Sequence, residues 1–318
     1  MKAANLDTLG SLPRYGEFEE PVPVPGEEIV TVRTAAIKPI DRAIAAGSHY
    51  GSPRELPVIC GMDGVGHAGD GSRVYFNALR RPFGAMAERS PAQLLVPVPD
   101  GLSDELAAAI VNPAIAAWLP LLWRGRLEAG ETVLILGATG SAGRFAVRAA
   151  RLLGAGRVIA AGRRQDVLET LDADAVIDLT APEADIAKAL AAEAAGGIQV
   201  VVDYLWGRPA ELTIESLVKH DVVTIAEHRA TRFVSVGEMA GSSIALGGMS
   251  LRASRLEIMG SGTANIPPAD RMREIVSDIF AHAAEGRLDM AVSVFPLQAV
   301  REAWTAAESG EIRPVLAL

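Results

Sequence analysis

The chain has almost no cysteine. Cys60 is the single cysteine among 318 residues, so no disulfide can form within the chain, which is typical of a reducing compartment. The sequence also lacks an excess of positive charge, because its net charge is −9. This balance argues against a general nucleic-acid surface or an anionic-membrane surface. Residues 1–7 contain no apolar signal core, and we therefore expect a cytoplasmic protein.

Charged residues are absent from the stretch 106–123, which approaches the length of a membrane span. Asn112, Pro113 and Pro120 interrupt this stretch. Asparagine is a favoured N-cap and proline fits the first position of a helix. The pattern therefore predicts one helix that ends near Val111 and another that begins at Pro113. We expect both helices to be largely buried inside the protein, and we expect no membrane span.

The length of the chain and its 49% hydrophobic residues suggest about two domains with a sizeable core. No internal repeat and no low-complexity linker is visible. Residues 1 to about 100 are rich in short strand patterns that proline and glycine interrupt. Strands are expected there at 28–34, 72–76 and 93–98.

From about Glu131 the pattern changes to an alternation of strands and helices. Such an alternation predicts a parallel sheet with helices on both faces. The final part of the chain predicts a helix at 268–285, a strand at 292–295 and a helix at 297–308. The strands of the alternating region are expected at 131–136, 157–161, 175–178, 198–203, 231–236 and 255–259, with a helix at 184–195.

The most informative motif is a turn of small residues that follows the apolar run Val133–Leu136. A helical pattern begins after the turn, near Arg144, and the N-terminus of such a helix offers free N–H groups to a pyrophosphate. The turn matches the dinucleotide-binding fingerprint, with alanine in place of the first glycine. Glycine can also serve only to make the bend, so the motif alone leaves both interpretations open. The predicted cofactor contacts in this turn, whose form is Ala138-x-Gly140-x-x-Gly143, are Thr139, Gly140, Ser141, Ala142 and Gly143.

The second strand of this region ends in Gly162, Arg163 and Arg164. An Asp or Glu here would bind the ribose 2′-hydroxyl of NAD, but no acid is present. Guanidinium groups match the geometry of a phosphate, so the sequence predicts NADP(H) as the cofactor. The alternative is that both arginines are solvated residues at the start of a helix. Val236 and Gly237, at the end of the strand expected at 231–236, are the remaining predicted cofactor contacts.

Several motifs follow one another with a specific order and spacing. They are Leu56–Gly66, Gly71–Val74, Pro99–Ser103, Gly130–Ile135, Phe295–Leu297, and the segment from Ala303 to Ser309 and Gly310. Together they resemble the medium-chain dehydrogenase/reductase superfamily, in its zinc-independent quinone oxidoreductase-like branch, along nearly the whole chain.

This resemblance implies an α/β fold with two domains. A GroES-like β-barrel catalytic domain would comprise residues 1–126 and be completed by 260–318. A Rossmann doubly wound parallel sheet would form the NADP-binding domain, residues 127–259, and the cleft between the domains would hold the nicotinamide. Members of the family are commonly dimers or tetramers, so a homo-oligomer, such as a dimer, is expected.

The chain differs from zinc-dependent relatives at their metal ligands. Those relatives place histidine and glutamate where this chain has Met62 and Asp63, and they place a cysteine near the segment 37–41, where this chain has none. Zinc prefers several thiolate or imidazole ligands in a tetrahedral arrangement. We therefore expect no metal, and without a Lewis acid the oxidation of an alcohol is disfavoured.

The resemblance points to Lys38 and Tyr50 as catalytic residues. Lys38 stands where relatives often carry an asparagine near the nicotinamide, and it could contact a substrate oxygen or a cofactor phosphate. Tyr50 stands where relatives often place a cleft tyrosine, with an offset of about one residue that leaves His49 as an alternative. Lys38 could instead be a surface lysine, and Tyr50 a packing residue. Asp41 is expected to cap the following helix.

The predicted function is NADPH-dependent transfer of hydride to a quinone or an α,β-unsaturated carbonyl compound, without zinc. Such an acceptor is already electrophilic, and the oxyanion that develops needs hydrogen-bond donors. Two alternatives are an NADP(H)-binding protein with little catalysis, in a structural or redox-sensing role, and an enoyl-thioester reductase. The expected partner is a small-molecule substrate, and neither nucleic acid nor a membrane.

Overall fold

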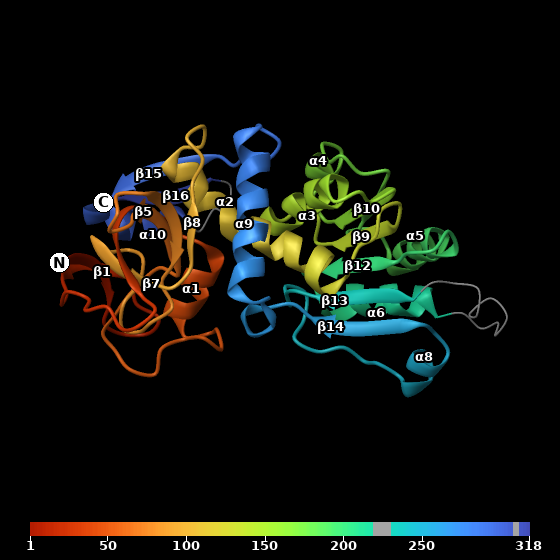
Figure 1. Cartoon of the computed structure of the whole chain (residues 1–318). Helices are drawn as coiled ribbons and strands as arrows, with labels where there is room; N and C mark the ends of the chain where they lie inside the picture. Colours follow the sequence, from red (N-terminus) through yellow and green to blue (C-terminus); the bar gives the residue numbers. More distant parts are fainter. Residues whose placement is uncertain (219–229, 308–311) are drawn as a thin grey trace. The chain divides into compact units, whose positions relative to one another are not determined.

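The computed structural model describes residues 1–218, 230–307 and 312–318. The chain forms two compact units, and the first of them is discontinuous in sequence. This unit comprises Met1–Asn112 and Pro268–Leu318, and the second comprises Pro113–Pro267. Figure 1 shows the C-terminal strands beside the N-terminal strands of the first unit, and strand pairing confirms this neighbourhood.

The first unit contains two sheets. The smaller sheet has the order β2 (Arg14–Glu17), β1 (Lys2–Leu6) and β4 (Val58–Ile59). The larger sheet has the order β15 (Val292–Pro296), β16 (Arg313–Ala317), β3 (Glu28–Ala36), β5 (Asp63–His67), β6 (Arg73–Asn77) and β8 (Leu95–Pro97), while β7 (Arg89–Ala92) also pairs with β3. The strands expected at 28–34, 72–76 and 93–98 are thus confirmed. Because β16 pairs antiparallel with β3, the end of the chain completes a sheet that its beginning starts.

Helices accompany these sheets. They are α1 (Pro39–Ala46), α9 (Ala269–Ala284), the 3-10 turn η3 (Leu297–Ala299) and α10 (Val300–Ala306). One face of α9 is apolar at a spacing of three and four residues, from Met272 through Ile279 to Ala283, and this face is buried. The helices expected at 268–285 and 297–308 are therefore confirmed, although residue 308 lies outside the described residues, as do Ser309 and Gly310.

The second unit is built around one parallel sheet. Its strand order is β11 (Ala175–Asp178), β10 (Arg157–Gly162), β9 (Thr132–Leu136), β12 (Val200–Asp203), β13 (Thr231–Ser235) and β14 (Leu256–Gly260). Numbered within the unit, this is the order 3-2-1-4-5-6 of a Rossmann fold. All pairs are parallel, which confirms the α/β class and the six expected strands.

Helices connect the strands of this sheet. They are α3 (Ser141–Leu152), α4 (Gln165–Leu168), α5 (Glu183–Ala195), α6 (Gly207–Leu217) and α8 (Gly248–Arg252), with the 3-10 turn η2 (Thr263–Asn265) after β14. Helix α5 confirms the helix expected at 184–195. It buries Ile186, Leu190 and Ala194, which recur every four residues and therefore lie on one face.

The predicted helix boundary at Asn112–Pro113 is wrong. Helix α2 (Asp104–Trp118) continues through Pro113, and the π-helical segment η1 (Leu119–Arg124) follows. Proline removes one intrahelical hydrogen bond, but the neighbouring side chains of Ala109, Ala114 and Trp118 are fully buried and hold the helix in place by packing. The stretch Asp104–Arg124 is long and apolar enough to cross a membrane, and 67% of its most apolar window is buried inside the structure, as in a core helix.

Candidate functional site

Three glycines shape the turn between β9 and α3, each for a different reason. Gly137 has a φ of 88°, a backbone conformation that favours glycine. A Cβ atom on Gly143 would lie 2.2 Å from the backbone oxygen of Gly137, so α3 can approach the strand only without a side chain there. A Cβ atom on Gly140 would meet nothing closer than 3.4 Å, and its φ of −76° suits any residue. Packing within the protein therefore requires Gly143 and does not require Gly140.

The N-terminus of α3 presents backbone donors beside this turn. Gly140 is its N-cap, without a side-chain cap, and the first turn contains no acidic residue. The backbone N–H of Arg144 donates to the Gly140 oxygen at 3.0 Å. The N–H groups of the three residues before it, Ser141 to Gly143, precede the first bond of the helix. Their arrangement and the open space at Gly140 fit a pyrophosphate group.

The end of β10 touches the same turn. The backbone N–H groups of Gly137 and Ala138 both donate to the Ala161 oxygen at 2.9 Å. A Cβ atom on the next residue, Gly162, would lie 2.5 Å from the Thr139 methyl group. The structure therefore brings the turn and the Gly162–Arg164 segment together.

The two arginines that follow Gly162 are both exposed. Arg164 forms an ion pair with Asp166 at 3.0 Å, in which both side chains are more than half exposed. The side chain of Arg163 makes no hydrogen bond or ion pair with the other residues that the structure describes. A guanidinium group near this turn is therefore open to an anionic ligand.

On the other side of β9, the ends of β12 and β13 are tied together through Asp203. This residue is fully buried, and its backbone oxygen accepts the N–H groups of Val236 at 2.7 Å and Gly237 at 3.2 Å. Its carboxylate Oδ1 accepts the N–H groups of Leu205 at 2.8 Å and Trp206 at 3.0 Å. Burial raises the pKa of Asp203 to about 6, and these two N–H groups oppose that shift.

Neither Asp203 nor Trp206 was predicted from the sequence. Trp206 has a φ of 54° and a ψ of −160°, a conformation that is otherwise almost restricted to glycine. The signal that could have found Asp203 is a single polar residue directly after the buried run Val200–Val202. The structure thus places every predicted cofactor residue at one carboxyl edge of one sheet, where such folds bind dinucleotides. The contact that each residue makes with a cofactor stays a prediction.

In the first unit, Lys38 lies in a buried cluster of charges. Its backbone N–H donates to Asp41 Oδ2 at 3.0 Å, which confirms that Asp41 caps α1. Its side chain is fully buried, so the alternative of a surface lysine is wrong. The Nζ atom lies 2.7 Å from Asp63 Oδ1, 3.2 Å from the Ala36 oxygen and 3.2 Å from Asp41 Oδ2. An ammonium group has three N–H donors, and all three are satisfied here.

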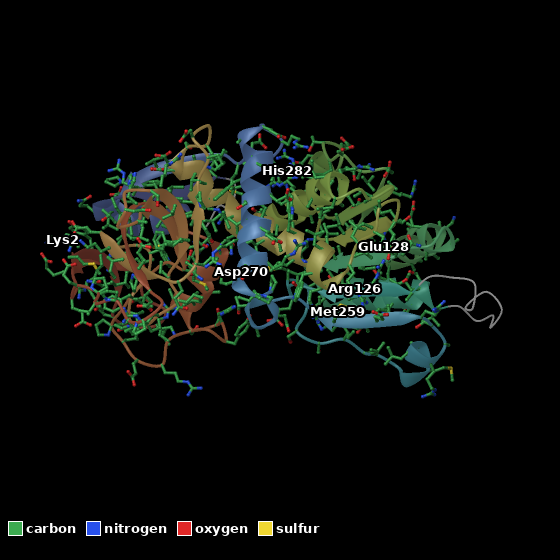
Figure 2. The ribbon with its side chains drawn as sticks, in the orientation of Figure 1. Lys2, Arg126, Glu128, Met259, Asp270 and His282 are labelled. Atoms are coloured by element: carbon green, nitrogen blue, oxygen red, sulfur yellow. The ribbon has the colours of Figure 1, made fainter. Side chains whose placement is uncertain are left out.

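The neighbours of this cluster keep its charges balanced. Burial by itself lowers the pKa of Lys38, but the Asp41 and Asp63 carboxylates raise it above its ordinary value, so the ammonium group stays charged. Burial and the Asp63 carboxylate raise the pKa of Tyr75, whose hydroxyl is hydrogen-bonded to Asp63. Arg313 on β16 donates to the Ile37 oxygen at 3.2 Å. By contrast, the side chain of Lys2, which is labelled in Figure 2, is partly exposed and pairs with Glu17.

Tyr50 has a different environment from Lys38. It follows α1, its side chain is 73% exposed, and its ring stacks on His49 with 4.1 Å between the ring centroids. Burial lowers the pKa of His49, and the His49 Nδ1 atom accepts the Gly51 N–H at 3.0 Å. Tyr50 therefore lies at the surface of the first unit, whereas the ammonium group of Lys38 is enclosed.

Comparison with known proteins now adds to this geometry. A family model described as zinc-binding dehydrogenase matches residues 171–313. A probable NADPH-dependent quinone reductase of Emericella nidulans is 28% identical, with 96% of each chain covered. The quinone oxidoreductase of Thermus thermophilus, solved also as a complex with NADPH, is 26% identical, with a TM-score of 0.77 and full coverage of both chains. Together, these similarities support the medium-chain dehydrogenase/reductase superfamily, in its quinone oxidoreductase-like branch.

Other relatives of this quinone oxidoreductase-like chain are parts of larger proteins. A phenolphthiocerol/phthiocerol polyketide synthase of Mycobacterium tuberculosis is 28% identical over 90% of this chain, which spans only 13% of that protein. A mycobacterial quinone oxidoreductase that is 21% identical has the same fold, with a TM-score of 0.83 and full coverage of both chains.

The name of the matching family model raises the question of zinc. The match does not include residues 37–63, where zinc-dependent relatives carry two of their ligands. Within residues 1–218, 230–307 and 312–318, no group of three or more His, Cys, Asp or Glu side chains could hold a metal ion. Asp41 and Asp63 are bound to the Lys38 ammonium, and burial raises the pKa of the Cys60 thiol, which opposes a thiolate. Among the residues that the structure describes, these donors therefore do not fit a zinc ion.

Proposed function

We propose that the chain is an NADPH-dependent reductase that transfers hydride to a quinone or an α,β-unsaturated carbonyl compound without zinc. The observation that carries this proposal is the convergence of the β9–α3 turn, the Gly162–Arg164 segment and the Val236–Gly237 segment at one edge of the second unit's sheet. The printed names of the Emericella and Thermus relatives support NADPH as the cofactor and a quinone as the acceptor.

The residues of this edge bind different parts of the cofactor. The N–H groups at the start of α3 bind the pyrophosphate, and the space beside Gly140 admits it. Arg163 and Arg164 bind the 2′-phosphate through charge-assisted hydrogen bonds. Asp203 holds the backbone of Val236 and Gly237 in place beneath the cofactor. When bound, the nicotinamide supplies the hydride.

Tyr50 is the side chain that we put forward as donor to the oxygen that becomes anionic. Its side chain is 73% exposed. Lys38 was the other predicted donor, but in this arrangement its three N–H groups are already bound to Ala36, Asp41 and Asp63. A hydrogen-bond donor aimed at a developing oxyanion accelerates such a reaction substantially. Water supplies the proton that completes the reduction.

The test is steady-state oxidation of NADPH and of NADH with a panel of quinones and enones, together with the affinity of the protein for each cofactor. We expect turnover with NADPH and much weaker binding of NADH. Equal affinity for the two cofactors would contradict the assignment of Arg163 and Arg164. Binding of NADPH without turnover of any acceptor would favour the alternative of a cofactor-binding protein with a structural or redox-sensing role.

A second candidate is reduction of an enoyl thioester. The similarity to a polyketide synthase over 90% of this chain favours it, because polyketide chains are built as thioesters. Assays with a short enoyl thioester beside a quinone separate the two candidates by their kcat/KM values. A cytoplasmic location and a homodimer belong to the same proposal, and sedimentation of the purified protein tests the dimer.

A further inference from the structure

Two segments that carry metal ligands in zinc-dependent relatives meet in the first unit of this chain. One contains Lys38 and Asp41, and the other contains Met62 and Asp63. The Met62 N–H donates to Asp41 Oδ1 at 3.1 Å, and Lys38 Nζ lies 2.7 Å from Asp63 Oδ1. The two segments are therefore connected by the Met62–Asp41 hydrogen bond and by the side chain of Lys38.

We propose that the ammonium group of Lys38 is a built-in cation that replaces a metal ion at this place. It crosslinks the end of β3, the start of α1 and the start of β5 through Ala36, Asp41 and Asp63. The crosslink holds the Met62 backbone through Asp41, and the first unit needs no metal to fix these segments.

Burial and geometry support a closed cation site. The side chains of Lys38, Asp41 and Asp63 are 0%, 1% and 9% exposed. Each N–H group of the ammonium has an oxygen partner within 3.2 Å. A buried charge is stable only when it is paired and hydrogen-bonded. The Lys38 ammonium meets both conditions. A metal ion would have to displace this ammonium to reach the same carboxylates.

Other charged groups also face the site. Arg313, which is largely buried, interacts electrostatically with both Asp41 and Asp63, and Arg81 interacts with Asp41. The Tyr75 hydroxyl on β6 is hydrogen-bonded to Asp63, and the buried Cys60 thiol lies near Asp41. Removing the Lys38 charge would leave the two buried carboxylates without the ammonium group that lies within 3.2 Å of both.

A consequence for the substrate class follows, and this consequence rests on the proposed reductase function. An ammonium whose hydrogens are all bound is not a Lewis acid and cannot ionise an alcohol. The acceptors must therefore be electrophilic without help from a metal, as quinones are. We expect no oxidation of simple alcohols, with or without added zinc.

The first experiment compares thermal unfolding of the full chain with that of Lys38→Met, Asp63→Asn and the double variant. Lys38→Met removes the ammonium group from both carboxylates and should lower Tm by on the order of 10 °C. Asp63→Asn should lower Tm in the wild-type background but raise it in the Lys38→Met background, because it then removes a buried charge that has lost its ammonium partner. Lys188→Met, which alters an exposed lysine on α5, is the matched control and should leave Tm unchanged.

This change of sign distinguishes a paired cation from a lysine that only fills space. If Asp63→Asn lowers Tm equally in both backgrounds, the proposal is overturned. If Lys38→Met is recovered only as unfolded protein, the double variant should still fold. Failure of the double variant to fold would also overturn the proposal.

The second experiment measures zinc by elemental analysis of protein purified without added metal, and Tm with and without a chelator. We expect far less than one zinc per chain and an unchanged Tm. About one zinc per chain, together with a fall of Tm in the presence of a chelator, would overturn the proposal that Lys38 replaces a metal ion. Absence of any reductase activity would sink the proposed function and the substrate consequence, but it would leave the unfolding cycle and the zinc measurement as tests of Lys38.

Discussion

The two regions that carry the functional argument are built in opposite ways. At the carboxyl edge of the second unit's sheet, a missing side chain at Gly140 creates room, and the N-terminus of α3 presents backbone donors beside it. In the first unit, the Lys38 cluster contains long charged side chains whose donors are all satisfied inside the protein. The first arrangement is open to a ligand, and the second is closed to one.

This difference distinguishes groups that can bind a ligand from groups that stabilise the structure. A ligand needs polar groups near the surface that can still form contacts, such as the Arg163 guanidinium, for which the described part of the chain provides no partner. A buried ion pair whose members keep all their hydrogen bonds contributes to the structure. Replacing one member is costly because the other charge is left unpaired. Variants at the sheet edge should therefore change cofactor affinity, whereas variants around Lys38 should change stability.

The largest effect is expected from Gly143→Val, with Gly140→Val as its matched control. The new Cβ at Gly143 would lie 2.2 Å from a backbone oxygen, so the second unit should lose its fold and all NADPH binding. Gly140 has room for a Cβ, so Gly140→Val should fold and should lose NADPH binding only because the side chain occupies the pyrophosphate site. Circular dichroism and a fluorescence titration measure the two effects. Normal NADPH binding by Gly140→Val would mean that the pyrophosphate lies elsewhere.

The next effect concerns Asp203, whose pKa burial raises to about 6. A raised carboxyl pKa means that the folded state binds a proton more tightly than the unfolded state. The contribution of Asp203 to stability is therefore greatest below about pH 4 and is lost as the pH rises through 6, by roughly 3 kcal/mol in total. Asp203→Asn removes this dependence, so the difference in unfolding free energy between wild type and variant should change with pH in that window. A difference that is constant from pH 4 to 7 would contradict the raised pKa.

Tyr50→Phe removes the proposed catalytic donor of the first unit. The substitution leaves the carboxyl edge of the second unit's sheet unchanged. We expect kcat to fall about 100-fold for an enone and less for a quinone, because quinones accept hydride more readily. The Kd for NADPH should not change. Steady-state kinetics on both acceptors and a cofactor titration provide the measurements. Unchanged turnover of every accepted substrate would assign the oxyanion contact to water and backbone groups.

The smallest effect is expected from the double variant Arg163→Ala, Arg164→Ala. Loss of two charge-assisted contacts to the 2′-phosphate should raise the Kd for NADPH at least about tenfold and leave NADH binding nearly unchanged. Arg301→Ala, an exposed arginine of the first unit, is the control. A parallel loss of NADH affinity would show that the arginines support the fold of the edge and do not recognise the phosphate.

Much of the fold was predictable because its elements follow local periodicity. The runs Val133–Leu136 and Val200–Val202 are apolar without interruption, as strands buried on both faces must be. The helix boundary at Pro113 was mispredicted for the opposite reason. Its cause is the packing of Ala109, Ala114 and Trp118 against distant residues, which outweighs a single lost hydrogen bond.

The candidate site was predictable to a similar degree. The sequence predicted that the glycine turn, Arg163 and Arg164 lie close together, since a fingerprint places its residues on one strand, turn and helix, and their contacts with a cofactor stay a prediction. Asp203 was not found, because its importance depends on hydrogen bonds to Leu205, Trp206 and the end of another strand. The role of Lys38 was not found either, since its partner Asp63 comes from a separate strand.

The sequence by itself therefore determined the second unit's alternation of strands and helices, the turn for a dinucleotide and the lack of metal ligands at the positions of zinc-dependent relatives. These properties depend on residue type and on spacing along one short segment. Only the tertiary structure decided that Lys38 is enclosed and paired, that Gly143 is required by packing while Gly140 is not, and that Asp203 joins two strands. The physical reason is that burial, charge pairing and close approach depend on atoms far apart in the chain, which local patterns do not specify.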